Sequence, residues 1–511
     1  MAVNSMTGAA SRGKPDWSQI DWQKARSNVR RLQVRIAKAV KEGRWSKVKA
    51  LQRLLTTSFS GKALAVKRVT ENQGKRTPGV DRIIWDSPGK KVRGLSSLRR
   101  RGYHPQPLRR VFIPKANGKL RPLGIPTMID RAMQALHLLA LLPIAETTAD
   151  PNSYGFRPYR AARDAVGRCF LALKGKGTAE WVLDADISAC FDEISKDWLI
   201  ANIPMDKAIL RKWLNSGYMQ DGKWFETRAG TPQGGIISPT LANMTLDGME
   251  ALLWSHFGPQ HRNRTTKVYV VRYADDFVIT GSSPDVLEQA KSLITDFLSE
   301  RGLSLSDEKT RVVRVEEGFD FLGWTVRRKK GQLFIKPAAK NVAAFVRKVR
   351  AIITGATSIT QGELIARLNP VIRGWANYHR NQVSKDTFDK VDSYIWERLW
   401  RWACRRHHNK SRRWVKQKYF PREGDLNWVF KAAMTDRNGN TTVERLFKAA
   451  SVPIRRHAKI RAAANPFDPI WDSYFANRRR SPGSLTDRSS RPTSTFALEL
   501  PARVTPGFAE A

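Results

Sequence analysis

Two adjacent carboxylates interrupt the most strand-like part of the sequence. The segment from Val268 to Thr280 is rich in β-branched and aromatic residues on both sides of Asp275 and Asp276, and this composition predicts strands. Burying two unpaired charges inside a sheet is costly, so we expect a tight hairpin turn that lifts both carboxylates out of the sheet. Their oxygens are suitable ligands for a hard divalent cation. A plain acidic turn is the alternative that this short pattern leaves open.

A second acidic segment lies within a predicted strand that runs from Trp181 to Phe191. Alternation along a strand places Asp184 and Asp186 on one face. If the two acidic strands are neighbours in one sheet, Asp186 and Asp275 can bridge a pair of metal ions, as in-line phosphoryl displacement requires. The alternative is a strand that leaves the core through an ordinary polar turn.

The charge balance is strongly one-sided. Of 511 residues, 90 are Lys or Arg and 46 are Asp or Glu, which gives a formal net charge of +44. Such an excess repels itself unless a polyanion neutralises it, so nucleic acid is the expected partner. The apolar content of 41% and the 17 tryptophans argue for folded cores rather than general disorder.

Several classes of protein are excluded by what the sequence lacks. Three widely spaced cysteines without a C-x-x-C pair argue against a disulfide framework or a cysteine-rich zinc module. The most apolar stretch, Ala132 to Ala145, falls short of the roughly 20 residues of a membrane span. The N-terminus has no apolar region typical of a secretory signal. We therefore expect no membrane partner and a cytoplasmic location, in a bacterium.

The segments that must position the acidic residues suggest an α+β fold. Residues 21–55 show helical periodicity with a break at Gly43, and basic residues dominate the spaces between the apolar positions. Residues 66–330 alternate strand and helix patterns, which predicts a mainly antiparallel sheet. A third strand-like segment begins at Phe319, and helical patterns prevail after Lys336.

These motifs together resemble a known family. YADD within VVRYADDFVIT, DADISACFD and GTPQGGIISPTLANMTLD resemble the palm motifs of reverse transcriptases, and more narrowly the reverse transcriptases and maturases encoded by group II introns. Further matching segments occur in order: NQGKRTPGVD, VFIPKANGKLRPLGIPTMIDRAMQ, NSYGFRP, LSDEKT, FDFLGW, RLNPVIRGWANYHR and WACRRHHNKSRRWVKQKYF. The resemblance covers about 400 residues, and many motifs in one order are far more specific than any single motif.

The resemblance implies a right-hand polymerase architecture. We expect a basic helical N-terminal extension at 1–65, fingers and palm at 66–335, an α-helical thumb or maturase domain X at 336–420, a basic C-terminal DNA-binding region at 421–477 and a disordered tail at 478–511.

The resemblance also assigns roles in catalysis. Asp186 and Asp275 are implied to bridge two magnesium ions, with Asp276 nearby and the Ile187 carbonyl as a further ligand. Such ions would activate the primer hydroxyl and stabilise the departing pyrophosphate.

Five further residues are implied to contact the incoming deoxynucleoside triphosphate. Lys115 and Arg121 would hold the triphosphate, although an exposed basic hairpin tip is the alternative. Phe191 would exclude a ribose 2′-hydroxyl, although an isolated Phe is more often core. Gln233 would lie near the templating base, and Lys309 would either protonate pyrophosphate or contact a phosphate.

Two basic regions are candidates for RNA contact, by phosphate neutralisation. The residues are Arg30, Arg31, Arg35 and Lys38 in the N-terminal helical region, and Arg373, Arg380, Arg405, Arg406, Lys410 and Arg412 in the thumb. The thumb tryptophans are interpreted as helical core.

The family resemblance implies an RNA-directed DNA polymerase and maturase that binds its host intron RNA, assists splicing, and uses a DNA target and primer during retrohoming. Two alternatives are a splicing maturase without polymerase activity and a stand-alone reverse transcriptase of a host or defence system. Many relatives end in an HNH endonuclease, but no paired cysteines follow Ala464–Arg480 here. We therefore predict no second-strand cleavage.

Overall fold

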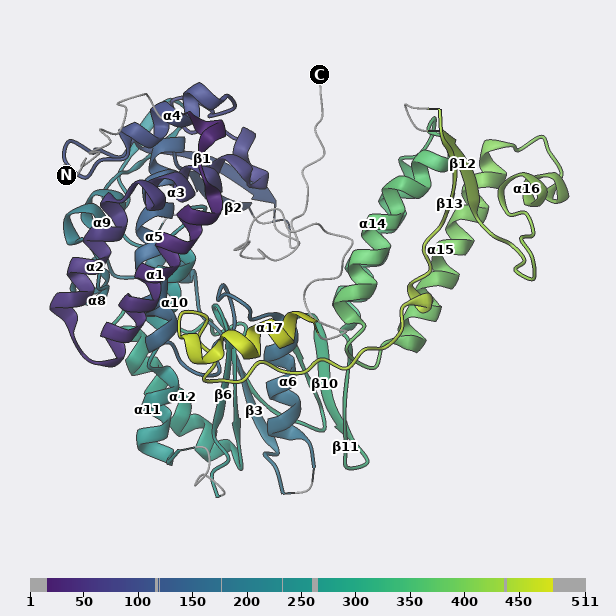
Figure 1. Ribbon diagram of the computed structural model, residues 1–511. Helices are drawn as coiled ribbons and strands as arrows, with labels where there is room; N and C mark the ends of the chain where they lie inside the picture. Colours follow the sequence, from purple (N-terminus) through teal and green to yellow (C-terminus); the bar gives the residue numbers. More distant parts are fainter. Residues whose placement is uncertain are drawn as a thin grey trace, which may run out of the picture.

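The computed structural model describes residues 16–480 apart from 115–117, 119, 176, 232, 260–264 and 436–438. The expected disordered tail therefore lies outside the described residues from 481 onward. Figure 1 shows the N-terminal helices and the palm on one side and a long helical arm on the other, joined through the region of β10 (Trp324–Lys329) and β11 (Gln332–Pro337).

The N-terminal helices form one unit with the fingers. They are η1 (Trp17–Gln19), α1 (Trp22–Lys41), α2 (Trp45–Thr57), α3 (Phe59–Glu71), η2 (Gln73–Arg76) and α4 (Pro88–Ser97). The Asp21 side chain caps the start of α1, and Gly43 provides the predicted break before α2. The apolar positions of α1 are buried in the same core as α5 and the back of the palm sheet. The expected boundary between the N-terminal extension and the fingers, at residue 65, falls inside α3, which continues to Glu71.

Helix α5 (Met128–Thr148) is the central element of this core. Its 21 residues exceed the apolar stretch seen in the sequence, and it is the one helix of the described part of the chain that is long and apolar enough to cross a membrane. However, 89% of its most apolar window is buried inside the protein. In this structure α5 packs against α1, α2, α3 and α10 (Figure 1).

The fingers sheet lies next to these helices. It has the order β2-β1-β4-β5, with antiparallel pairs at both ends and a parallel contact between β1 and β4. The strands are β1 (Leu108–Pro114), β2 (Leu120–Ile125), β4 (Tyr218–Gln220) and β5 (Lys223–Phe225). Short helices α8 (Lys196–Asn202) and α9 (Lys207–Leu214) precede β4.

The palm sheet is antiparallel, as the sequence predicted. Its order is β6-β7-β3-β8, formed by β3 (Trp181–Asp186), β6 (Tyr269–Tyr273), β7 (Asp276–Gly281) and β8 (Arg311–Arg314). The helices associated with it are α6 (Ala162–Leu173), α7 (Cys190–Glu193), α10 (Ser238–Leu246), α11 (Met249–Phe257) and α12 (Pro284–Ser299).

One sequence prediction for the palm was wrong. The strand expected to continue to Phe191 ends at Asp186, and residues 190–193 form the helical turn α7. Ala189 has a φ of +39° at the start of this turn, a conformation that no strand accommodates. The chain therefore changes direction immediately after the acidic strand end.

The predicted strand at Phe319 is a hairpin that leads to the thumb. Strands β9 (Phe319–Phe321), β10 (Trp324–Lys329) and β11 (Gln332–Pro337) form a separate antiparallel sheet. Phe321 and Trp324 are buried. The Trp324 ring stacks on Tyr378 of α14 at 4.4 Å, so this sheet is connected directly to the thumb.

The thumb is the helical arm of Figure 1. It contains α13 (Ala339–Thr354), α14 (Gln361–His379), α15 (Lys385–Arg406) and α16 (Arg412–Tyr419), followed by the hairpin of β12 (Lys431–Thr435) and β13 (Thr441–Arg445) and by η3 (Ala449–Ser451). The thumb has a hydrophobic core of its own, separate from the core of the N-terminal helices and from the core that α6 forms with the palm sheet. Trp402 is buried in the thumb core. Trp375, Trp400 and Trp414 pack partly buried against this core, while Trp396 is exposed at 37%.

The C-terminal segment returns from the thumb to the palm and the N-terminal helices. Residues 452–480, called the strap below, include η4 (Pro469–Trp471) and α17 (Asp472–Arg480), and Figure 1 shows them in yellow across the palm. Ile460, Ala464 and Phe475 are buried with α6 and the palm sheet. Phe467 is buried in the N-terminal core. This part of the segment expected to bind DNA is therefore packed into the protein.

Candidate active site

The predicted acidic hairpin is present. Strands β6 and β7 are joined by the two residues Ala274 and Asp275, and Ala274 has a φ of +59°, as tight hairpin turns require. The apolar side chains Val271 and Val278 anchor the two strands in the core of the palm. Asp275 therefore projects from the turn, as predicted. The prediction was wrong for Asp276, which stays in the sheet as the first residue of β7, paired with Tyr273 of β6.

The second acidic strand lies beside this hairpin, as expected. Strand β3 pairs with β7 so that Asp186 is directly opposite Asp276. The Asp186 carbonyl accepts a hydrogen bond from the Ser306 amide at 2.9 Å, and Ile187 bridges Leu305. These contacts bring the segment that carries Lys309 to the end of β3, and the Lys309 ammonium hydrogen-bonds and pairs with Asp186.

The three carboxylates form a concentrated negative charge. Desolvation, followed by repulsion from Asp275 and Asp186, raises the pKa of Asp276 to about 8. Desolvation also raises the pKa of Asp275, an effect that the nearby positive charges of Arg121 and Lys309 oppose. The cluster lacks enough positive charge in the protein alone, and hard oxygen donors with this deficit suit a divalent cation.

Arg121 lies across from this acidic cluster. It belongs to β2, opposite Ile113 on β1, and its positive charge opposes the rise in the pKa of Asp275 that burial causes. The hairpin between β1 and β2 thus brings one predicted triphosphate-binding residue toward the carboxylates. Lys115, the other one, lies outside the described residues.

Gln233 and Phe191 lie on two segments that contact each other. The Gln233 side-chain amide donates to Asp192 at 2.8 Å, and the backbone carbonyl of Gln233 accepts from the Gly124 amide at 2.8 Å. The Phe191 carbonyl accepts from the Thr231 amide at 2.6 Å. Phe191 is partly buried against the core. Asp192 was not predicted as a site residue, although it ends the DADISACFD motif and orients Gln233.

Gly234 allows the fingers and palm to approach at this point. It has a φ of +118°, and a Cβ there would lie 2.7 Å from the Gly124 carbonyl oxygen. Any other residue would push β2, which carries Arg121, away from the Gln233 turn.

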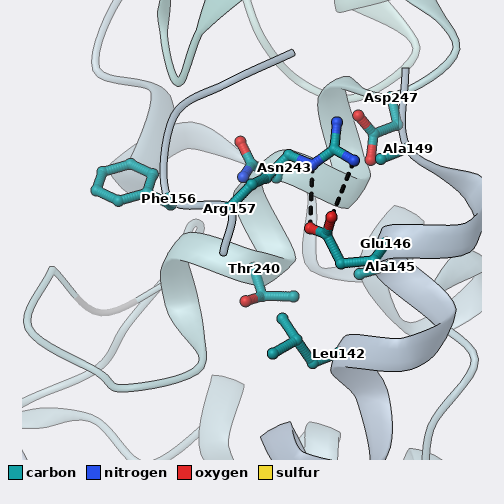
Figure 2. Close-up of a pocket in the computed structure, with 9 residues that line it drawn as sticks. All are labelled: Leu142, Ala145, Glu146, Ala149, Phe156, Arg157, Thr240, Asn243 and Asp247. Carbon is teal, nitrogen blue, oxygen red and sulfur yellow. Dashed lines mark hydrogen bonds and ion pairs between the residues drawn. The ribbon is translucent and has the colours of Figure 1, made fainter. Parts of the chain in front are cut away.

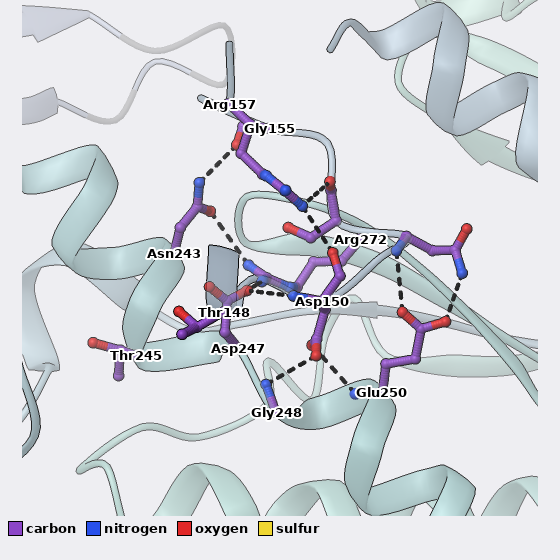
Figure 3. A network of polar contacts seen from close by, with 12 residues as sticks. Thr148, Asp150, Gly155, Arg157, Asn243, Thr245, Asp247, Gly248, Glu250 and Arg272 are labelled. Carbon is purple, nitrogen blue, oxygen red and sulfur yellow. Dashed lines mark hydrogen bonds and ion pairs between the residues drawn. The ribbon is translucent and has the colours of Figure 1, made fainter. Parts of the chain in front are cut away.

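A buried polar network behind the acidic hairpin was missed by the sequence analysis. The Arg272 guanidinium on β6 donates to Asp247 at 2.5 Å and to Asn243 at 3.3 Å (Figure 3). The Arg272 backbone exchanges hydrogen bonds with the 152–154 loop: its amide donates to the Asn152 carbonyl, and its carbonyl accepts from the Tyr154 amide. Burial raises the pKa of Asp247 to about 7 despite its pairing with Arg272. This network fixes the base of the hairpin that carries Asp275.

A small cavity beside this network is too small for substrate. It is lined by Leu142, Ala145, Glu146, Ala149, Phe156, Arg157, Thr240, Asn243 and Asp247 (Figure 2). Its volume of about 10 Å³ has room for no more than one water molecule. This cavity is therefore not a candidate substrate site.

The predicted RNA-contacting residues divide by exposure: three are partly buried and bond within the protein, and seven are exposed. Arg30 pairs with Asp472 of the strap at 2.9 Å, and Arg406 donates to the Ile359 carbonyl at 2.6 Å. Arg380 donates to Asn377 at 3.1 Å and is half-buried. The exposed members are Arg31, Arg35, Lys38, Arg373, Arg405, Lys410 and Arg412. The α1 group and the thumb group lie on separate parts of the molecule (Figure 1).

Within the described ranges, no group of three or more His, Cys, Asp or Glu side chains is arranged so that it could hold a metal ion. Reverse transcriptases generally use divalent metal ions. Magnesium typically takes only one or two protein carboxylates and completes its shell with water and substrate phosphates. Asp186 and Asp275 fit that requirement by type and position.

Known families match three consecutive parts of the chain. Residues 17–98 match the N-terminal domain of reverse transcriptase, residues 113–326 match reverse transcriptase (RNA-dependent DNA polymerase), and residues 342–420 match the group II intron maturase-specific domain. These ranges correspond to the N-terminal helices, the fingers and palm, and the thumb.

Individual relatives agree with these matches. Protein YkfC of Escherichia coli is 33% identical over 325 residues, which cover 55% of this chain and 84% of that protein. The group II intron-encoded protein LtrA of Lactococcus lactis is 30% identical over 339 residues, or 53% of this chain and 55% of LtrA, so the match spans about half of LtrA. A telomerase structure from Candida albicans aligns at 12% identity with a TM-score of 0.34, covering 64% of this chain and 67% of that one. The chain belongs to the family of group II intron-encoded proteins, with a reverse transcriptase domain followed by a maturase domain.

Proposed function

We propose that this protein copies its host group II intron RNA into DNA and assists the splicing of that RNA. The observation that carries the polymerase part is the register of β3 and β7, which sets Asp186 opposite Asp276 with Asp275 in the adjoining turn. A fold kept only as an RNA-binding scaffold would have no chemical need for three crowded carboxylates, because their repulsion is destabilising.

We assign two magnesium ions to Asp186 and Asp275, with Asp276 and the Ile187 carbonyl close by. When bound, such ions lower the pKa of the primer hydroxyl and neutralise charge on the triphosphate. In the reaction, the primer 3′ oxygen bonds to the α-phosphorus of the deoxynucleotide while the bond from that phosphorus to the pyrophosphate oxygen breaks.

The remaining site residues bind and orient the deoxynucleotide. Arg121, placed opposite the carboxylates, supports triphosphate binding, and we assign Lys115 the same role. Asp192 holds the Gln233 amide, which supports a fixed position for Gln233 near the templating base. We assign Phe191 to the exclusion of the ribose 2′-hydroxyl.

Lys309 has two candidate roles in this proposal. Its ammonium pairs with Asp186, and hydrogen bonding to that carboxylate raises the pKa of Lys309. A protonated amine beside the acidic cluster supports donation of a proton to the departing pyrophosphate. A direct ion pair with a phosphate is the alternative.

RNA binding would use the exposed basic residues of α1 and the thumb. Splicing assistance needs no protein chemistry, because the intron RNA is itself the catalyst and basic side chains screen repulsion between its phosphates. Without second-strand cleavage by the protein, the primer would have to come from elsewhere, such as a nascent DNA strand at a replication fork. We also propose that the protein does not cleave the second DNA strand and acts in a bacterial cytoplasm.

Primer extension is the decisive experiment. Wild-type protein and Asp275→Asn are compared on an intron RNA template with a DNA primer, magnesium and deoxynucleotides, while host-intron splicing is followed in parallel at low salt. We expect Asp275→Asn to lose DNA synthesis by at least about 1,000-fold and to retain splicing assistance. Wild-type splicing without DNA synthesis would instead favour a maturase without polymerase activity.

A second measurement addresses strand cleavage. Duplex target DNA is incubated with the ribonucleoprotein and analysed for nicks in the strand opposite the insertion site. We expect no protein-dependent nick there. Cleavage of that strand would contradict the proposal.

A further inference from the structure

Phe156 has an unfavourable backbone conformation close to the candidate active site. It lies in the loop between α5 and α6 and has a φ of +58°. Bulky residues rarely adopt this left-handed region. Such conformations persist only where the surrounding structure enforces them, and they concentrate at functional sites.

The residues on both sides of Phe156 are fixed by buried hydrogen bonds (Figure 3). The Gly155 carbonyl accepts from the Asn243 side chain at 2.7 Å. The Arg157 guanidinium donates to both Glu146 oxygens at 3.0 Å and also to two backbone carbonyls of the same loop. The loop therefore cannot relax at residue 156 without breaking this network.

The enforced conformation directs the Phe156 ring away from the Arg157–Glu146 pair (Figure 2). It meets the ring of Phe191 edge to face, with centroids 6.1 Å apart and an interplanar angle of 79°. Edge-to-face contact is a favoured aromatic geometry. Phe156 itself is half-buried, so burial in the core does not by itself explain its strained position.

The backbone of Phe191 is held on a different side. Its carbonyl accepts from Thr231, and a Cβ at Gly230 would lie 2.4 Å from that same carbonyl oxygen. These contacts fix the main chain of α7. The orientation of the Phe191 ring depends in addition on what its face or edge touches, and the Phe156 ring provides such a contact.

We propose that Phe156 is a positioning residue for sugar discrimination: it holds the Phe191 ring where that ring excludes a ribose 2′-hydroxyl. This inference rests on the proposed role of Phe191. A Phe191 ring without its edge-to-face neighbour would turn more freely and admit ribonucleotides more often. Aromatic pairs of this type correspond to about a two- to tenfold change in an equilibrium.

The test measures the ratio of kcat/KM for a deoxynucleotide to kcat/KM for the matching ribonucleotide on one template. Phe156→Gly removes the ring and at the same time permits the positive φ, so backbone strain does not confuse the result. Phe191→Ala and the double variant complete the set, and Phe156→Tyr is the conservative variant. We expect the ratio to fall about two- to tenfold in Phe156→Gly, to fall further in Phe191→Ala, and to stay near wild type in Phe156→Tyr.

The double variant should discriminate no worse than Phe191→Ala alone, because Phe156 acts only through Phe191. Independent, multiplying losses would overturn the proposal, as would an unchanged ratio in Phe156→Gly. General damage to the fold would lower both kcat/KM values equally and leave the ratio unchanged.

An unchanged ratio in Phe191→Ala would instead show that Phe191 does not exclude ribose, and polymerase activity of the wild type would separate that result from loss of the proposed function.

Discussion

Arg157 and Glu146 form a buried bidentate ion pair at the loop behind the acidic hairpin. The Nε and Nη2 atoms of Arg157 each lie 3.0 Å from a Glu146 oxygen, and the two side chains are only 5% and 2% exposed. The pairing with Glu146 raises the pKa of Arg157, although burial alone would lower it. The ion pair therefore holds the loop that carries Arg157 against α5, which carries Glu146.

Removing one partner of this pair should destabilise the protein strongly. Glu146→Gln leaves a buried guanidinium without its counter-charge, and we expect the free energy of unfolding to fall by about 3–5 kcal/mol. Denaturant unfolding measures this change. The matched control is Glu397→Gln, which breaks the exposed pair with Arg401 and should cost less than about 1 kcal/mol. Equal losses in both variants would contradict this account.

Gly155 should be essential for the position of the catalytic turn. A Cβ at residue 155 would lie 2.4 Å from the Ala274 amide nitrogen, so Gly155→Ala must displace the turn that carries Asp275. We expect primer extension to fall by about 100-fold or more, because such displacements of about 1 Å have this effect.

Gly374 provides the matched control for this substitution. It is exposed within α14, and a Cβ there would meet no atom within 4 Å. Gly374→Ala should keep primer extension intact and stabilise the protein by about 0.5–1 kcal/mol. A normal rate of synthesis by Gly155→Ala would contradict the close approach of loop and hairpin.

Substitutions of Lys309 should distinguish proton donation from phosphate contact. Lys309→Arg keeps the positive charge but not a group that releases a proton at ordinary pH. If Lys309 protonates pyrophosphate, Lys309→Arg and Lys309→Met should both lose about 100-fold or more in the chemical step, measured by single-turnover incorporation. If Lys309 only pairs with a phosphate, Lys309→Arg should retain most activity while Lys309→Met does not.

Asp164 should control attachment of the strap. Its Oδ1 atom accepts from His457 at 2.8 Å, from the Ile460 amide at 2.7 Å and from Arg478 at 3.0 Å. Burial opposes the charged form, but the contacts with His457 and Arg478 outweigh it and lower the pKa of Asp164. Asp164→Asn removes the charge, and we expect a loss of about 3 kcal/mol in unfolding free energy at pH 7.

The sign of the pH effect follows from the lowered pKa. The stabilisation is present above the unfolded-state pKa of about 3.9 and is lost as pH falls through the lower folded value. The difference in stability between wild type and Asp164→Asn should therefore shrink below about pH 4, as measured by denaturant titrations from pH 7 downward. Asp472→Asn, which affects the exposed pair with Arg30, is the control with little expected effect. A difference that stays constant through pH 3 would contradict the role of the charge.

The sequence by itself determined the acidic centre and the order of the parts. The β-branched and aromatic residues on both sides of Asp275 and Asp276 predicted two strands, and the cost of burying two charges predicted a turn between these strands. A different, helical periodicity of apolar residues predicted α1 and α2 with their break at Gly43, because residues three and four positions apart lie on one face of a helix. These inferences need only neighbouring residues, which is why they agree with the structure.

Tertiary structure alone decided which distant residues meet. Asp192 orients Gln233 across 41 positions, Phe156 touches Phe191 through a strained loop, and the strap reaches Asp164 across nearly 300 residues. No local pattern in the sequence indicates these contacts, because each contact depends on how separate elements pack. The basic character of Arg30 suggested RNA, but its pairing with Asp472 depends on where the strap lies. A charge in the sequence fixes what a side chain can bind, whereas packing fixes which partner is within reach.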